Sequence, residues 1–152
     1  MKPTPKGWPR VSASVFYDDA ATAIDWLCQA FGFEVRLKVE GEAGRIEHSE
    51  LGFGDGLIMV SSVKHDGPAN RSGFVSPKTL DGKNTMALCV VVDNVDEHCD
   101  KARQAGATIS MEPETHDYGD DYWVDRTYQA TDLEGHRWWF MQRLSEGRPA
   151  GA

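Results

Sequence analysis

The chain has 152 residues and a formal net charge of −8, and 40% of its residues are hydrophobic. This length suits one compact domain or two small modules that share a core, and the apolar content excludes global disorder. The acidic balance argues against nucleic acid as a partner, because binding to a phosphate backbone needs clustered Lys and Arg. The longest apolar run, at 86–92, is too short to cross a membrane.

Two further features point to a cytoplasmic location. The N-terminal segment MKPTPKGWPR lacks the apolar core of an export signal. Cys28, Cys89 and Cys99 are scattered and include no CxxC pair, as expected in a reducing compartment. We therefore expect a cytoplasmic protein that binds neither nucleic acid nor a membrane.

In chain order, the first elements are an apolar strand and a helix, and they occur twice. The segments 11–35 (VSASVFYDDAATAIDWLCQAFGFEV) and 86–109 (MALCVVVDNVDEHCDKARQAGATI) both have this order, with a capping residue before the helix. Gly32 and Gly106 end the two helices, since glycine adopts the left-handed conformation of a helix terminus. This is the signature of an internal repeat.

The later elements also repeat. Residues 45–60 (RIEHSELGFGDGLIMV) align with 126–141 (RTYQATDLEGHRWWFM), and each segment has a glycine turn between two strands. Each half is therefore predicted to have the element order βαβββ, with the first module at 10–63 and the second at 84–143. The segment 64–83 is rich in Gly and Pro and is predicted to be the linker within one domain of 1–152.

The duplicated module resembles the vicinal oxygen chelate superfamily, which contains glyoxalase I, bleomycin-resistance proteins and extradiol dioxygenases. The closer resemblance is to its PhnB-like branch, through 47–51 (EHSEL), 124–126 (VDR) and 132–138 (DLEGHRW). Val124 and Leu133 depart from that branch, which usually has Gly and Pro there. The resemblance implies an α+β fold, with duplicated βαβββ modules forming an eight-stranded cup, and a homodimer.

Metal-using members of the superfamily take four ligands from equivalent strands of the two modules. By alignment these positions are Ser12, Ile58 (or Met59, if the register slips by one), Ala87 and Trp139. None of these side chains is a His or carboxylate ligand for a divalent metal. The resemblance thus implies no metal and no cofactor, and it argues against a glyoxalase reaction, which needs a metal to polarise the enediolate oxygens.

His48 and Glu50 are the candidates for a catalytic pair. Period-two alternation places them with Ile46 on one face of a strand and places Glu47 and Ser49 on the other. A His and a Glu on one face could bind a metal or act as an acid–base pair. The alternative is that both are surface residues at the rim of a half-exposed strand.

The segment 112–126 holds six carboxylates. Its aromatic residues are Tyr118, Tyr122 and Trp123. Negative charge beside aromatic rings favours a cationic aromatic ligand. The alternative is a solvated acidic loop whose rings pack under the edge of a sheet.

Two residues near this segment have both a structural and a functional interpretation. Arg126 either contacts the ligand or forms a structural bidentate pair with Asp125, the Asp–Arg pair of the branch's motif, that holds the start of the strand. His136 is expected to make a structural hydrogen bond within its turn.

Adjacent strand residues face opposite sides, so Trp138 should pack against the helices while Trp139 points into the cup. Trp139 there indicates either an apolar pocket or a filled core. The same alternation predicts an inner wall made of Ser12, Ser14, Phe16, Ala87, Cys89 and Val91. The predicted ligand-binding residues are Ser12, Ser14, Phe16, His48, Trp123, Arg126 and Trp139.

Three classes of function follow from these observations. The leading class is a metal-independent protein that binds a small organic molecule in the cup. The second is an enzyme (a lyase, isomerase or dioxygenase) with a non-standard site around His48 and Glu50. The third is a structural or interaction module whose cup is filled by Trp139 and Phe16.

Overall fold

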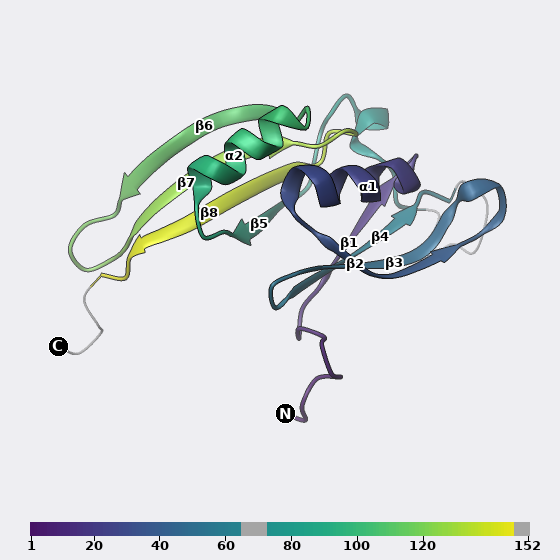
Figure 1. Cartoon of the computed structure of the whole chain (residues 1–152), viewed down its shortest axis with the longest axis horizontal. Helices are drawn as coiled ribbons and strands as arrows, with labels where there is room; N and C mark the ends of the chain where they lie inside the picture. Colours follow the sequence, from purple (N-terminus) through teal and green to yellow (C-terminus); the bar gives the residue numbers. More distant parts are fainter. Residues whose placement is uncertain (65–72, 148–152) are drawn as a thin grey trace. The chain divides into compact units, whose positions relative to one another are not determined.

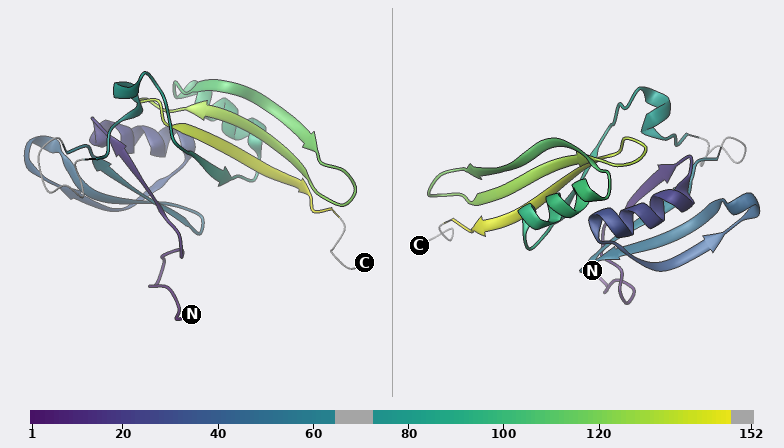
Figure 2. Two further views of the ribbon diagram at one scale, coloured as in Figure 1. Left: turned by 180° about the vertical axis from the view of Figure 1, so that it is seen from behind. Right: turned by 45° about the horizontal axis from the view of Figure 1, so that its top comes forward.

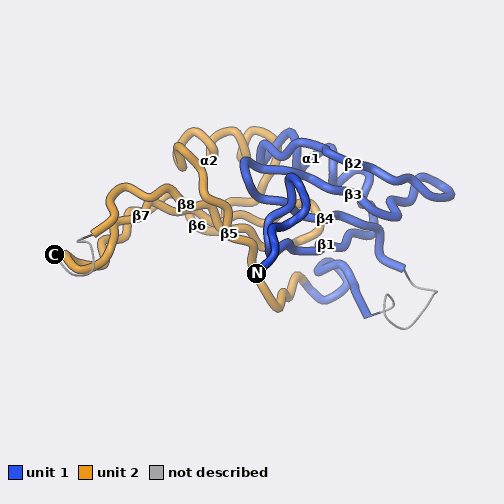
Figure 3. The backbone as a smooth tube through the Cα atoms, turned by 90° about the horizontal axis from the view of Figure 1, so that it is seen from below, with its two compact units in different colours: residues 1–81 blue, residues 82–152 orange. Residues whose placement is uncertain are grey.

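The computed structural model describes residues 1–64 and 73–147. The chain divides into two compact units, Met1–Asp81 and Gly82–Ala152, each with its own sheet and its own helix (Figure 3). In the described part of the chain, neither helix has the length and hydrophobicity that would let it span a membrane.

The first unit contains one βαβββ module (Figure 1). Its elements are β1 (Ala13–Tyr17), α1 (Ala20–Phe31), β2 (Glu34–Glu40), β3 (Ile46–Phe53) and β4 (Gly56–Ser62). The sheet has the order β1-β4-β3-β2, in which β1 and β4 are parallel and the other neighbours are antiparallel. The predicted linker at 64–83 lies partly outside the described residues, and its described part includes a 3₁₀ turn, Pro77–Leu80.

Helix α1 begins and ends where its sequence predicts. The side chain of Asp19 accepts a hydrogen bond from the Thr22 backbone N–H at 3.1 Å, which caps the first turn. Gly32 ends the helix in the left-handed conformation, with φ at 83°. Between them, Ile24 and Leu27 belong to a buried stripe at helical spacing.

The second unit repeats this order with β5 to β8 and α2. Its elements are β5 (Ala87–Val91), α2 (Val95–Gln104), β6 (Thr108–Asp117), β7 (Val124–Thr131) and β8 (Arg137–Ser145). The sheet order β5-β8-β7-β6 matches that of the first unit, again with a parallel first pair. Asn94 caps α2 by accepting from the Glu97 backbone N–H at 3.1 Å. The predicted α+β fold with a duplicated βαβββ module is confirmed.

Each helix covers one face of its own sheet and leaves the other face open (Figure 2). In β1, Val15 and Tyr17 are buried, while Ser14 is exposed and Phe16 is half-buried on the opposite side. The same alternation in the second unit buries Trp138, whose indole is 1% exposed. We call the uncovered sides the open faces. They carry the predicted binding residues Ser14 and Phe16 on β1 and Trp139 on β8.

The predicted alternation in β3 is wrong at its start. Strand β2 pairs Val39 with His48 but Glu40 with Ile46, so Glu47 is an extra residue, a β-bulge. Ile46 is buried at 1% exposure and does not share a face with His48. Because the bulge resets the alternation, Glu47 and His48 both reach the open face.

Candidate functional site

The open face of the β1–β4 sheet carries a hollow of about 440 Å³. Six of its lining side chains come from three strands. They are Ser14 and Phe16 on β1, Glu47 and His48 on β3, and Met59 and Ser61 on β4. A cavity of this size, with mixed apolar and polar walls, is typical of small-molecule sites.

An aromatic pair forms part of the wall. The rings of Phe16 and Phe74 stack with their centroids 4.1 Å apart and their planes 10° from parallel. Phe74 is 45% exposed, so a large part of its surface remains available to a bound molecule. Sequence reasoning identified Phe16 but missed Phe74, whose only signal is that it is the sole aromatic residue of the linker 64–83.

His48 and Glu50 lie together on the open face, as the strand alternation predicts. The imidazole Nε2 is 3.4 Å from Glu50 Oε1, and the two side chains are 38% and 14% exposed. This separation allows a weak hydrogen bond and brings a proton-carrying ring beside a carboxylate. The structure therefore brings the catalytic candidates together; their role stays a prediction.

Glu47 also contributes to the hollow, which the predicted strand alternation did not anticipate. Its carboxylate forms an ion pair with the Lys64 ammonium group, and both side chains line the hollow. The bulge that directs Glu47 to this face has no simple sequence signature. The pair places one charge of each sign at the wall.

In the second unit, Trp138 and Trp139 point to opposite sides of their sheet, as predicted. Trp138 is buried on the side of α2, and its indole N–H donates to Asp132 at 2.9 Å. Trp139 is 38% exposed and pairs with Cys89 across the ladder on the open face. The opposed directions of the two indoles are confirmed; whether Trp139 lines an apolar pocket or fills a core stays a prediction.

Arg126 does not pair with its neighbour Asp125, since adjacent strand residues face opposite sides. Its guanidinium instead holds both carboxylate oxygens of Asp96 at 2.7 Å, in the first turn of α2. This contact lowers the pKa of Asp96 from its ordinary value. Arg126 thus lies on the helix side of the sheet, away from the open face, and the predicted pair with Asp125 is wrong because the two side chains face opposite sides.

Charges within 112–126 are partly neutralised by the chain itself. Glu112 pairs with Arg103, and the hydrogen bond from that guanidinium lowers the pKa of the carboxyl group. Asp125 pairs with Arg143 at 2.5 Å, and the Arg143 guanidinium also lies 4.9 Å from the ring centre of Trp123. One face of Trp123 is therefore already occupied by an internal cation, which weakens its case as the binding surface for a cationic ligand.

The family model for the Glyoxalase/Bleomycin resistance protein/Dioxygenase superfamily matches residues 10–140. The chain belongs to this superfamily. An uncharacterised protein of Mycobacterium bovis is 30% identical to this superfamily member over 138 residues, which cover 91% of the chain and 86% of that protein. An uncharacterised protein of Mycobacterium tuberculosis H37Rv is 30% identical over 138 residues, covering 91% and 76%.

Solved structures agree with this assignment. TioX from Micromonospora sp. ML1 has a TM-score of 0.68 at 29% identity, covering 90% of this chain and 99% of that one. A glyoxalase/bleomycin resistance protein/dioxygenase family enzyme from Burkholderia phytofirmans PsJN has a TM-score of 0.59 at 18% identity, covering 88% and 97%. The second likeness shows the fold alone.

The alignment left Ile58 and Met59 as alternatives for one of the superfamily's metal positions, and the strand pairing decides between them. Ser14 pairs with Met59 and Cys89 pairs with Trp139, so Met59 is the residue equivalent to Trp139. Ile58 is excluded because it is buried on the side of α1.

With this register, the residues that align with the metal ligands of metal-using superfamily members are Ser12, Met59, Ala87 and Trp139. Ser12 Oγ is buried and lacks a hydrogen-bond partner among the described residues, but a lone hydroxyl is not a divalent-metal site. Among residues 1–64 and 73–147, no three His, Cys, Asp or Glu side chains gather as metal ligands. The donor set does not fit the superfamily's metal.

Proposed function

We propose that this superfamily member binds a small organic molecule in the hollow on the open face of the β1–β4 sheet, without a divalent metal. The observation that carries the proposal is the stacked pair of Phe16 and Phe74 at the wall of a hollow of about 440 Å³. A half-exposed aromatic ring offers a flat apolar surface on which another ring stacks. We therefore expect the ligand to contain a flat aromatic group.

Polar groups around the rings support an oriented ligand. Ser14 and Ser61 place hydroxyl groups at the wall, and Glu47 and Lys64 add an ion pair. Glu50 does not line the hollow, but it contacts His48, which does, and His48 is its only ion-pair partner among the described residues. This carboxylate supports a cationic group on the ligand, in place of the more neutralised segment 112–126.

Isothermal titration calorimetry with three probes tests the proposal. N-methylquinolinium is flat, aromatic and cationic, quinoline is its neutral counterpart, and N-methylquinuclidinium is a cation without an aromatic ring. We expect N-methylquinolinium to bind most tightly, and Phe74→Ala to weaken that binding. Tyr122→Ala is the matched control, because Tyr122 is an exposed aromatic residue outside the hollow. Equal heats for all three probes, or equal effects of both variants, would contradict the proposal.

The contact between His48 and Glu50 favours an enzyme as the second candidate. A superfamily lyase, isomerase or dioxygenase could use this pair for proton transfer. Incubation with small α-keto compounds, followed by NMR, tests for turnover. Turnover that is lost in both His48→Gln and Glu50→Gln would favour the enzyme over the binding protein.

The proposal also includes the PhnB-like branch, a homodimer and a cytoplasmic location. The segments EHSEL and DLEGHRW support the PhnB-like branch. The three cysteines are free, which supports a reducing compartment such as the cytoplasm. Sedimentation equilibrium measures the oligomeric state directly, and a monomer at micromolar concentration would remove the dimer from the proposal.

A further inference from the structure

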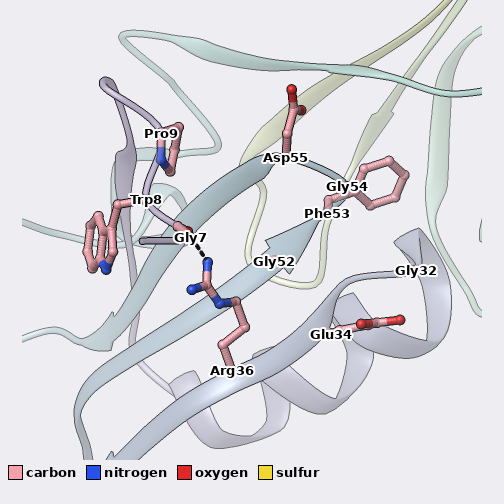
Figure 4. A pocket seen from close by; sticks show the side chains of 10 residues that line it. All are labelled: Gly7, Trp8, Pro9, Gly32, Glu34, Arg36, Gly52, Phe53, Gly54 and Asp55. Atoms are coloured by element: carbon pink, nitrogen blue, oxygen red, sulfur yellow. Dashed lines mark hydrogen bonds between the residues drawn. The ribbon is translucent and has the colours of Figure 1, made fainter. Parts of the chain in front are cut away.

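A second hollow, which we call the N-terminal groove, lies at another part of the first unit and shares no lining residue with the hollow around Phe16 (Figure 4). It is bordered by residues 7–9, by Glu34 and Arg36 on β2, and by residues 52–55 at the turn between β3 and β4. Its volume is about 830 Å³. This size is within the range of small-molecule sites.

A β-bulge directs the side chain of Arg36 into this groove. The pairing of β2 with β3 skips Arg36 between Val35 and Leu37, so Arg36 is an extra residue on its strand. Its stem lies against Gly52, where a Cβ would approach Arg36 Cδ to 3.0 Å. Bulges re-aim side chains and are common beside functional sites, so this bulge draws attention to the residue it re-aims.

The N-terminal segment holds the Arg36 guanidinium in place. Its Nη1 donates to the Gly7 carbonyl oxygen, and Figure 4 shows the side chain reaching from β2 towards Gly7. A Cβ at Gly7 would lie 2.6 Å from Arg36 Nη2, so the glycine leaves the space that the guanidinium occupies. A group that is already held in one position loses little conformational entropy when a ligand binds.

The charge of Arg36 has no counter-ion in the described part of the chain. Within residues 1–64 and 73–147, no carboxylate lies within ion-pair distance of Arg36. Glu34 and Asp55 border the groove, but Figure 4 shows both carboxylates pointing away from the guanidinium. The N–H groups that Gly7 does not use form a planar fork, which suits the oxygens of a carboxylate or phosphate.

The sequence around the groove is basic, although the whole chain has a net charge of −8. Residues 1–17 contain Lys2, Lys6 and Arg10 and no Asp or Glu. Lys6 and Arg10 directly flank the residues 7–9 that border the groove. Exposed charges of this kind raise the local concentration of anions and contribute less to affinity than a direct contact does.

Phe53 provides an apolar wall beside the cation. Its ring is half-buried, and its centroid lies 5.5 Å from that of Phe33, which belongs to the core. The core therefore supports the ring from one side. Gly32, Gly52 and Gly54 also border the groove, and the absence of side chains there leaves room for a ligand against the backbone.

We infer that the N-terminal groove binds a small organic anion. The Arg36 guanidinium holds its carboxylate or phosphate oxygens through charge-assisted hydrogen bonds, and its apolar part packs on Phe53. This site is independent of the function proposed for the hollow around Phe16, and it selects the opposite charge.

Isothermal titration calorimetry with matched probes tests the inference. The carboxylate probe is 3-phenylpropanoate, the phosphate probe is 3-phenylpropyl phosphate, and 3-phenylpropan-1-ol is their neutral counterpart. We expect the anions to bind about tenfold or more tightly than the alcohol, as a charge-assisted hydrogen bond predicts. The tighter of the two anions identifies the oxyanion that Arg36 prefers. Propanoate, which lacks the ring, should bind more weakly than 3-phenylpropanoate.

Variants of Arg36 test its role directly. Arg36→Gln should abolish the preference for the anions over the alcohol. Arg36→Glu should reverse the charge preference, so that 3-phenylpropylammonium binds more tightly than 3-phenylpropanoate. Arg10→Gln is the matched control, because Arg10 is another exposed arginine that donates to a backbone carbonyl, and it should change the affinities less than about twofold. Phe74→Ala should leave 3-phenylpropanoate binding unchanged, which separates this site from the hollow around Phe16.

Two measurements keep the bond between Arg36 and Gly7 intact, so they test the site even if the Arg36 variants release the N-terminal segment. Glu34→Gln removes a negative charge from the border of the groove and should not weaken 3-phenylpropanoate. NMR of the wild-type protein should show shifts of the Arg36 Nε–H and of the Gly52 and Gly54 amides when 3-phenylpropanoate is added. Equal affinity for the anions and the alcohol, wild-type affinity for 3-phenylpropanoate in Arg36→Gln, or shifts confined to β1 and β4 would each overturn the inference.

Discussion

The Asp132 carboxylate accepts the indole N–H of Trp138 at 2.9 Å, and both side chains are buried. Its other oxygen accepts the backbone N–H groups of Glu134 and His136, and the His136 ring lies 3.3 Å from the same carboxylate. This network fixes the turn between β7 and β8 onto the core. The structural hydrogen bond expected for His136 is confirmed. The segment DLEGHRW therefore supplies residues that hold this turn in place.

Asp132→Asn should therefore destabilise the protein. The amide has one oxygen in place of two, so at least one buried donor loses its partner, at a cost of about 1–3 kcal/mol. Urea unfolding followed by fluorescence measures the change. Asp121→Asn is the control, because Asp121 is an exposed carboxylate outside the network, and it should change stability little. Equal stability of the two variants would contradict the role of Asp132.

Truncation of the adjacent residues Trp138 and Trp139 should destabilise the protein to different extents. Trp138→Ala removes a buried ring and should cost about 3–5 kcal/mol of unfolding free energy. Trp139→Ala removes a ring that is 38% exposed and should cost clearly less. Thermal and urea unfolding of both variants provide the comparison, and equal losses would show that Trp139 is a core residue.

Trp139 is also predicted to contact the ligand. If it does, Trp139→Ala should weaken N-methylquinolinium binding by about two- to tenfold, as expected for loss of one aromatic contact. Calorimetry at one pH and salt concentration measures the effect. Tyr122→Ala controls for general loss of aromatic surface. Unchanged affinity in Trp139→Ala would restrict the ligand to the hollow around Phe16 and Phe74.

Local sequence signals predicted the fold well because each element has its own cue. Asp19 and Gly32 bound α1, and the repeat of these cues in the second half predicts the second module. The site was harder to predict, since a bulge is a property of strand pairing. Glu47 therefore lies on the open face, where simple alternation does not place it, and Ile46 lies on the opposite, buried face.

Contacts between distant residues also escaped the sequence. Phe74 reaches Phe16 from a segment without periodicity, so no pattern could place it at the site. Arg126 lies beside Asp125 in the sequence but pairs with Asp96, because alternation turns neighbours to opposite faces. Residue type was informative in each case, but the partner depended on the tertiary fold.

The ion pair of Asp96 and Arg126 should make a small contribution to stability that depends on pH. Because Arg126 lowers the folded-state pKa of Asp96 below its ordinary value of 3.8, the contribution is present above pH 3.8. It is lost as the pH falls through the folded pKa. The pair is largely exposed, so we expect well under about 1 kcal/mol at neutral pH.

Urea unfolding of the wild type and Asp96→Asn between pH 7 and pH 3 measures this contribution. The difference in unfolding free energy should be constant near neutrality and should shrink below pH 3.8. Asp100→Asn, on the same helix and outside the ion pair, is the control. A difference that grows as the pH falls would give the opposite sign and would contradict the assignment.

Metal content should be low, because the positions equivalent to the superfamily's ligands are Ser12, Met59, Ala87 and Trp139. A hydroxyl, a thioether, a methyl group and an indole do not form a divalent-metal site. Inductively coupled plasma analysis of protein purified without chelator should show well under one equivalent of Ni, Zn, Fe or Mn per chain. His48 and Glu50 are the remaining candidates, so His48→Gln and Glu50→Gln should not change the metal content. A stoichiometric metal that disappears in either variant would establish a different metal site and would favour the enzyme over the metal-independent binding protein.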